Sequence, residues 1–270
     1  MKKLIILFFI TTASHAQVIL SPYVVYIDQQ QKFGSYIVQN ESSEDYEINV
    51  SFVFGYTVSD SLGNITLKYI ENPSDSVKSL VKWIRAFPRT FNLAPKERQV
   101  VRMTIRPPDS ISAGTYWGRI VTSASPKQKA VETQTAGVSA QIKFVLNQVT
   151  TVLYRKEPAN TGIIFHNFYT KTDSTHFNVF VDLERKGNSP FWCDVFIKVL
   201  DSNNNLIAEN RNYGPIYFRL LKKFPVELSK MPKGNYKIEA RIEFNEKEDI
   251  PDSNLEPIPP LFKTIFVDIN

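Results

Sequence analysis

Residues 85–106 read RAFPRTFNLAPKERQVVRMTIR, and this stretch predicts two β-strands joined by a turn. Phe91 and Leu93 place apolar side chains on one face with a period of two. A polar turn follows over residues 94–97, where proline fixes one φ angle, and the apolar alternation resumes over residues 101–105. The side chains expected on the opposite face of the second strand are Arg102, Thr104 and Arg106. The pattern indicates an all-β protein.

The composition fits more than one folded domain. The chain has 270 residues, which suits two domains of about 100–130 residues each. With 43% hydrophobic residues it can bury substantial cores, and its 16 prolines lie mostly between β-like runs, where edge strands and turns tolerate them. The formal net charge of +5 is small and scattered along the sequence, so it does not argue for nucleic acid as a partner.

The first residues have the pattern of a secretory signal peptide. Lys2 and Lys3 are followed by a short apolar run, and Ser14 and Ala16 supply small residues where a signal peptidase cleaves. We therefore expect residues 1–16 to be a signal peptide cleaved near Ala16. The apolar run is too short to span a bilayer. These features predict an exported protein, periplasmic in a Gram-negative cell.

Several motifs resemble one family. The run F-x-L-x-P-x-E-x-Q-x-V-R over residues 91–102 resembles the first domain of the PapD-like periplasmic pilus chaperones. The first strand, 18–27, is interrupted at Ser21-Pro22, and a proline there suggests an edge strand that changes partners. An N-x-S turn at 40–42 and a G-x-Y-x-x-R-I run at 114–120 are similar to the family's pattern as well.

The resemblance implies a fold and domain limits. The expected fold is two immunoglobulin-like β-sandwich domains in tandem, angled around a cleft, with an N-terminal domain at 17–157 and a C-terminal domain at 158–270. Short strands at regular spacing over the second half favour a second sandwich. Within it, residues 224–228 and 237–244 are expected to form a hairpin.

The resemblance also implies a partner-binding strand. Val138, Ala140 and Ile142 alternate with polar residues, as expected of a strand. In the family this strand completes the fold of a secreted, pilin-like subunit by strand addition, and a lysine on it binds the subunit's terminal carboxylate. Lys143 occupies that place, whereas Tyr23, Val24 and Val25 stand where the family's first-strand arginine is expected. The predicted partner-binding residues are Gln134, Ala136, Val138, Ala140, Ile142 and Lys143.

No catalytic constellation is apparent. His166 and His176 lack the spacing of metal ligands, and no nucleophile-elbow, zinc-protease or phosphate-binding motif is present. Cys193 is the single cysteine, so no internal disulfide can form, and its strand-like surroundings favour burial. The sequence predicts neither enzyme activity, nor a cofactor, nor a metal.

Three functional hypotheses remain open. The first is a chaperone of pilus, fimbrial or other surface subunits, which could also contact an outer-membrane assembly or self-associate through its edge strand. The second is an exported structural or adhesive module of a cell-surface assembly. The third is a carbohydrate-binding sandwich that uses exposed aromatic residues such as Trp117 or Trp192, although burial in a core is the commoner fate of such residues.

Overall fold

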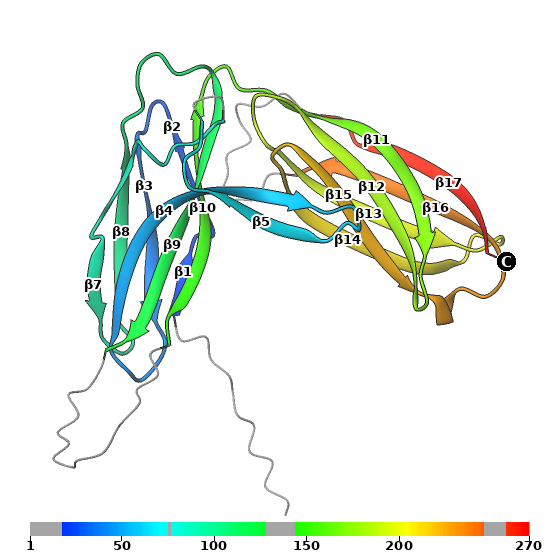
Figure 1. The fold of residues 1–270 in the computed structure, drawn as a ribbon, viewed down its shortest axis with the longest axis horizontal. Helices are drawn as coiled ribbons and strands as arrows, with labels where there is room; N and C mark the ends of the chain where they lie inside the picture. The colour runs from blue at the N-terminus through cyan, green and yellow to red at the C-terminus, as the bar shows by residue number, and fades with distance from the viewer. Residues whose placement is uncertain (1–17, 75–76, 128–143, 246–257, 270) are drawn as a thin grey trace, which may run out of the picture.

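The computed structural model describes residues 18–74, 77–127, 144–245 and 258–269. It consists of β-strands and one 3₁₀ turn, Leu228–Lys230, arranged as two β-sandwiches set at an angle (Figure 1). The predicted fold class is confirmed. Residues 1–16, where the signal peptide is predicted, lie outside the described residues.

Two sheets form the N-terminal sandwich. The four-stranded sheet has, in order, β1 (Val18–Ser21), β3 (Phe33–Asn40), β8 (Arg98–Ile105) and β6 (Ile84–Phe87). The other has β2 (Val24–Asp28), β10 (Leu146–Lys156), β9 (Gly114–Pro126), β4 (Tyr46–Ser59) and β5 (Ile65–Ile70), with β7 (Thr90–Leu93) also paired to β4. Alternate side chains from both sheets, such as Val38, Ile48 and Val101, fill the core between them.

The first strand changes sheets, as its proline predicted. β1 pairs antiparallel with β3 in one sheet, and β2 pairs parallel with β10 in the other. The change occurs at Ser21-Pro22, a cis peptide bond. Proline lacks a backbone N–H and so cannot continue a hydrogen-bonded ladder. One short segment therefore contributes to both layers of the sandwich.

The stretch at 85–106 carries the chain from one sheet to the other. β7 pairs with β4, whereas β8 lies between β3 and β6 in the opposite sheet. The turn between them is closed by the Glu97 carboxylate, which accepts from Ala94 N at 2.8 Å, and Lys96 takes a left-handed conformation with φ of 63°. The predicted strands and turn are confirmed, and the turn connects two layers instead of two neighbours.

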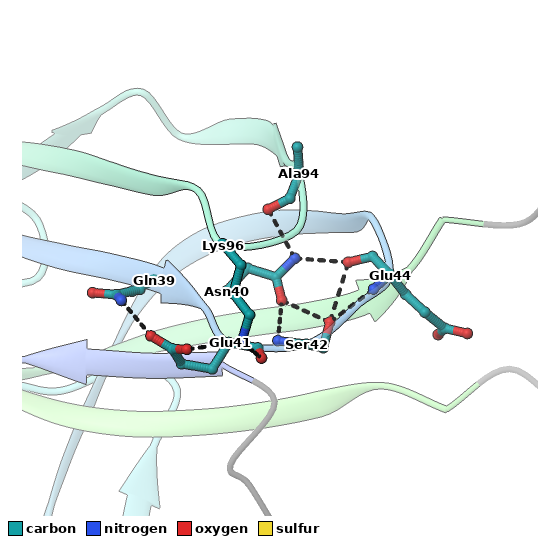
Figure 2. Close-up of polar contacts among 7 residues, drawn as sticks. All are labelled: Gln39, Asn40, Glu41, Ser42, Glu44, Ala94 and Lys96. Atoms are coloured by element: carbon teal, nitrogen blue, oxygen red, sulfur yellow. Dashed lines mark hydrogen bonds and ion pairs between the residues drawn. The ribbon is translucent and has the colours of Figure 1, made fainter.

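Asn40, the last residue of β3, fastens this turn from the strand next to β8 (Figure 2). Its Nδ2 group donates to the carbonyl oxygens of Glu44, Leu93 and Ala94 at 2.7, 3.1 and 3.0 Å. Its Oδ1 atom accepts from Ser42 N and Ser42 Oγ at 2.9 and 2.7 Å. Asn40 is fully buried, so its side chain depends on these bonds in place of water. The N-x-S turn thus starts at a buried asparagine, while its outer residues, such as Ser43, stay exposed.

Two sheets also form the C-terminal sandwich. One has the order β11 (Thr161–Thr172), β12 (His176–Gly187), β15 (Arg219–Glu227), and the other β14 (Leu206–Ile216), β13 (Phe191–Leu200), β16 (Gly234–Phe244), β17 (Leu261–Ile269). The hairpin predicted over 224–244 is wrong, because β15 pairs with β12 and β16 pairs with β13 and β17. The connection between β15 and β16 crosses from one layer to the other.

An aromatic cluster joins the two sandwiches. Trp117, Tyr217 and Trp192 are buried together with Phe54. The Trp117 and Tyr217 rings lie 4.7 Å apart between centroids. The place where the sandwiches meet is therefore packed with side chains instead of hollow.

The hairpin of β4 and β5 strengthens this junction. β4 extends beyond the N-terminal sandwich, and the hairpin reaches toward the C-terminal sandwich (Figure 1). Leu221 N donates to Ser59 Oγ at 2.8 Å, and Lys223 Nζ donates to Asn64 Oδ1 at 3.2 Å. The hairpin thus acts as a brace between the two sandwiches.

Candidate functional site

The predicted partner-binding residues fall in a part of the chain that the structure leaves undescribed. Gln134, Ala136, Val138, Ala140, Ile142 and Lys143 all lie within residues 128–143, outside the described residues. Their role stays a prediction. The structure does describe the chain directly after them, from Phe144 into β10.

β10 has an open backbone edge over its first half. On one side the whole strand pairs with β9, from Leu146 opposite Ala124 onward. On the other side β2 pairs only with Thr151–Arg155. Among the described residues, Leu146–Thr150 has no neighbouring strand on that second side. Unpaired N–H and C=O groups along a strand edge can accept another strand.

Exposed apolar side chains lie along the same segment. Phe144 is 76% exposed, Val145 51%, and Leu146 and Val149 40% each. Leu146 lies on the core-facing side of β10, in the alternation that buries Thr150 and Val152. Its exposure shows that the core of the N-terminal sandwich is incompletely covered at this edge. An extended apolar segment placed here would remove these side chains from water.

The first strand offers no cation to this site. Tyr23 is 70% exposed, whereas Val25 is buried in the core, and the family's arginine has no counterpart here. A buried arginine lies nearby, at the junction. Arg119 Nε donates to Gly55 O at 3.1 Å, its Nη1 donates to Thr151 Oγ1, and its guanidinium lies 5.1 Å from the Tyr217 ring. Sequence reasoning recognised Arg119 only as part of a motif, and the structure shows that it bridges strands at the junction.

No family model and no curated protein matches this sequence. Solved structures to which the chain is similar include the CsuC–CsuE chaperone–tip subunit pre-assembly complex of Acinetobacter baumannii Csu pili. The identity is 11%, the match covers 92% of this chain and 98% of that chain, and the TM-score is 0.48. Two others are the complex of SafA pilin with the SafB chaperone of Salmonella enterica and the Pseudomonas aeruginosa CupB2 chaperone.

The SafB complex is 10% identical, with 93% and 98% of the two chains covered and a TM-score of 0.46. CupB2 is 8% identical, with 93% and 100% covered and a TM-score of 0.46. All three structures contain chaperones. At this level of similarity we infer function from the geometry of β10 and not from these matches.

The tryptophans of the carbohydrate hypothesis are buried. Trp117 is 0% exposed and Trp192 5% exposed, and both belong to the cluster between the sandwiches. Neither can stack on a sugar ring in this structure. Cys193 is buried too, as expected, and burial raises the pKa of its thiol to about 11.

The histidines take part in local contacts. His166 Nε2 lies 2.5 Å from Glu184 Oε2, and His176 Nδ1 lies 2.8 Å from Thr175 Oγ1. Among the described residues, no group of three His, Cys, Asp or Glu side chains gathers as a metal site. In that same part of the chain, no helix is long and apolar enough to cross a membrane.

Proposed function

We propose that this chain is a periplasmic chaperone that binds an extended segment of a secreted, pilin-like subunit by strand addition along the free edge of β10. One observation supports this most directly: among the described residues, Leu146–Thr150 has no strand paired along its second edge, and exposed apolar side chains flank it. Strand addition uses both features, because main-chain hydrogen bonds provide affinity and alternate side chains provide specificity.

The proposed surface continues into the predicted residues. Val138, Ala140 and Ile142 would extend the same edge toward the partner and fill apolar gaps in its core, and Lys143 would bind its terminal carboxylate. Strand pairing and burial of apolar area provide the free energy of binding. The mechanism therefore requires neither a nucleotide nor a cofactor.

The test is capture of the partner from the native envelope by the tagged mature protein, with its identity established by mass spectrometry. The first variant is the double substitution Val138→Asp/Ile142→Asp, and the second is Leu146→Asp/Val149→Asp. Leu206→Asp is the control, because Leu206 is 53% exposed on the other sandwich. We expect both double variants to lose a small, secreted, β-rich subunit that the wild type and the control retain.

Hydrogen exchange then localises the contact. Binding of the purified subunit should slow exchange of the amides in 144–150, because they would enter a new ladder. Unchanged exchange there, or capture that both double variants retain, would contradict the proposal.

A structural or adhesive module is the second candidate function. The packed aromatic junction and the β4–β5 brace favour it, since they hold the two sandwiches as a rigid spacer. Recovery of the same large envelope assembly by the wild type and by both double variants would support this alternative.

A further inference from the structure

The outward side of the sheet β1-β3-β8-β6 carries a second, separate surface. β8 directs Val101, Met103 and Ile105 into the core, so its alternate residues point outward. Arg85 and Phe87 of β6 lie opposite Thr104 and Arg102 of β8, and Phe33 of β3 lies opposite Thr104 on the other side. We name this surface the basic face and define it by Arg85, Arg98, Arg102, Phe33, Phe87 and Val100.

The charge of the basic face has one sign. Arg85, Arg98 and Arg102 are all exposed, and none of them forms an ion pair with another described residue. The remaining outward positions of the four strands are serine, threonine, isoleucine and glutamine, so no carboxylate lies among them. The two carboxylates at the nearby turn bind groups outside the basic face: Glu41 forms an ion pair with Lys96, and Glu97 accepts a hydrogen bond from Ala94 N.

The arginines of the C-terminal sandwich behave differently. Arg211 pairs with Asp194 and Arg219 pairs with Asp182, each through two short hydrogen bonds. These two surface arginines have carboxylate partners, as does Arg241, which pairs with Glu243. Arg85 Nη1 donates to the carbonyl oxygens of Lys82 and Ile84, and among the described residues Arg98 and Arg102 leave two guanidinium groups available to an anion from outside.

Large apolar side chains stand among these arginines. Phe87 is 79% exposed, Phe33 60% and Val100 42%. Phe87 is the direct cross-strand neighbour of Arg102, so a fully exposed ring and a cation lie side by side. A face that combines exposed rings with unpaired arginines suits a partner that is anionic at its surface and apolar beneath it.

We propose that the basic face docks on an anionic phospholipid bilayer. Its arginines would bind lipid phosphates, which guanidinium groups hold well, and Phe33, Phe87 and Val100 would enter the boundary with the acyl chains. Arg98 and Arg102 are four residues apart on one strand, which separates their Cα atoms by about 13 Å. Such spacing on a flat sheet suits a broad array of phosphates better than a single acidic peptide.

The location of the face makes docking compatible with strand addition. The C-terminal sandwich contacts the opposite sheet, through β4 and β5, and β10 also belongs to that opposite sheet. The basic face thus stays uncovered by both, and this proposal does not depend on the proposed chaperone function.

The test is co-sedimentation of the full mature chain with vesicles of phosphatidylglycerol and phosphatidylcholine, compared with vesicles of phosphatidylcholine alone. We expect binding to the mixed vesicles only, weakened by added salt. Arg98→Ala/Arg102→Ala should lower the partition coefficient roughly twenty-five-fold, since each basic residue near an anionic membrane contributes about fivefold. Lys171→Ala/Lys233→Ala, an equal charge change at exposed sites of the other sandwich, should change it little.

A second readout reports apolar insertion. Phe87→Trp places an indole on the face, and its emission should shift to shorter wavelength when mixed vesicles are added. The proposal would be overturned if the double lysine variant lost as much vesicle binding as the double arginine variant. It would also be overturned if the emission wavelength of the indole did not change when mixed vesicles were added. Binding to poly-glutamate without binding to the mixed vesicles would overturn it in favour of an acidic polypeptide partner.

Discussion

The side-chain amide of Asn40 donates to the main-chain carbonyl of Ala94 at 3.0 Å, and so joins the end of β3 to the turn that starts β8. The same amide group also donates hydrogen bonds to the main-chain carbonyl oxygens of Leu93 and Glu44. One buried polar side chain thus satisfies main-chain groups from two segments, 42–44 and 93–94.

Replacement of Asn40 by aspartate should therefore destabilise the N-terminal sandwich. A carboxylate cannot donate, so the carbonyl groups of Leu93, Ala94 and Glu44 would lose their partner and face a negative charge. We expect the free energy of unfolding to fall by roughly 2–4 kcal/mol, measured by urea denaturation. Asn92→Asp, at an exposed position of β7, is the control, and an equal loss in both variants would contradict this account.

Cys193 should be unreactive in the folded protein. Burial raises its thiol pKa to about 11, so hardly any thiolate exists at neutral pH. A thiol reagent is expected to modify it only once denaturant unfolds the chain. Ser43→Cys, at an exposed turn, should react at once in the same protein, and rapid native labelling of Cys193 itself would show that its strand opens.

Asp194 should make part of the stability depend on pH. Its buried carboxylate accepts two hydrogen bonds from Arg211 at 2.7 Å and one from Asn245 at 2.6 Å, and these hold its pKa below the usual range. A folded-state pKa below the unfolded value adds stability above the ordinary carboxyl pKa, and this stability is lost as the pH falls through the folded value.

Asp194→Asn should consequently lower the free energy of unfolding at neutral pH, by about 1–3 kcal/mol. The difference between wild type and variant should shrink below pH 4, where the wild-type carboxyl becomes protonated. Denaturant unfolding curves of both proteins at several pH values measure this difference in the free energy of unfolding. A difference that stays constant down to the acid range would exclude this role of the carboxylate.

Gly63 should be required for the brace between the sandwiches. It has φ of 73°, and a Cβ atom there would lie 2.8 Å from Lys223 Cβ. Gly63→Ala is expected to cost roughly 1–2 kcal/mol through backbone strain and to lift the β4–β5 hairpin from β15, which would increase the radius of gyration in X-ray scattering. Gly162→Ala, where a Cβ finds ordinary contacts, should leave both quantities unchanged.

Side-chain alternation was enough to place many strands. The strand predicted around Phe91 and Leu93 is β7, and the alternation over 101–105 lies within β8. Strand pairing was harder to predict, as the hairpin wrongly expected over 224–244 shows. A period of two tells which side chains point inward, but β15 and β16 have the same alternation in whichever layer they lie.

The surfaces of the molecule were also difficult to predict. Arg85, Arg98 and Arg102 are separated in the sequence and form no basic block, yet strand pairing brings them onto one face. The brace was missed because alternation does not show how far a strand extends beyond its sandwich, and β4 continues through Gly55 to Ser59. Of the candidate site, the sequence predicted residues up to Lys143, and the open edge at Leu146–Thr150 required the pairing pattern.

The parallel pairing of β2 with β10 joins residues near the start of the described chain to residues at the end of the first sandwich. Synthesis from the N-terminus delivers β2 early and its partner strand only after more than half of the polypeptide has been made. Until then β2 has no ladder in its sheet, and the apolar side chains of Val25 and Ile27 lack the cover that β10 helps provide. An incomplete chain would therefore need protection from aggregation.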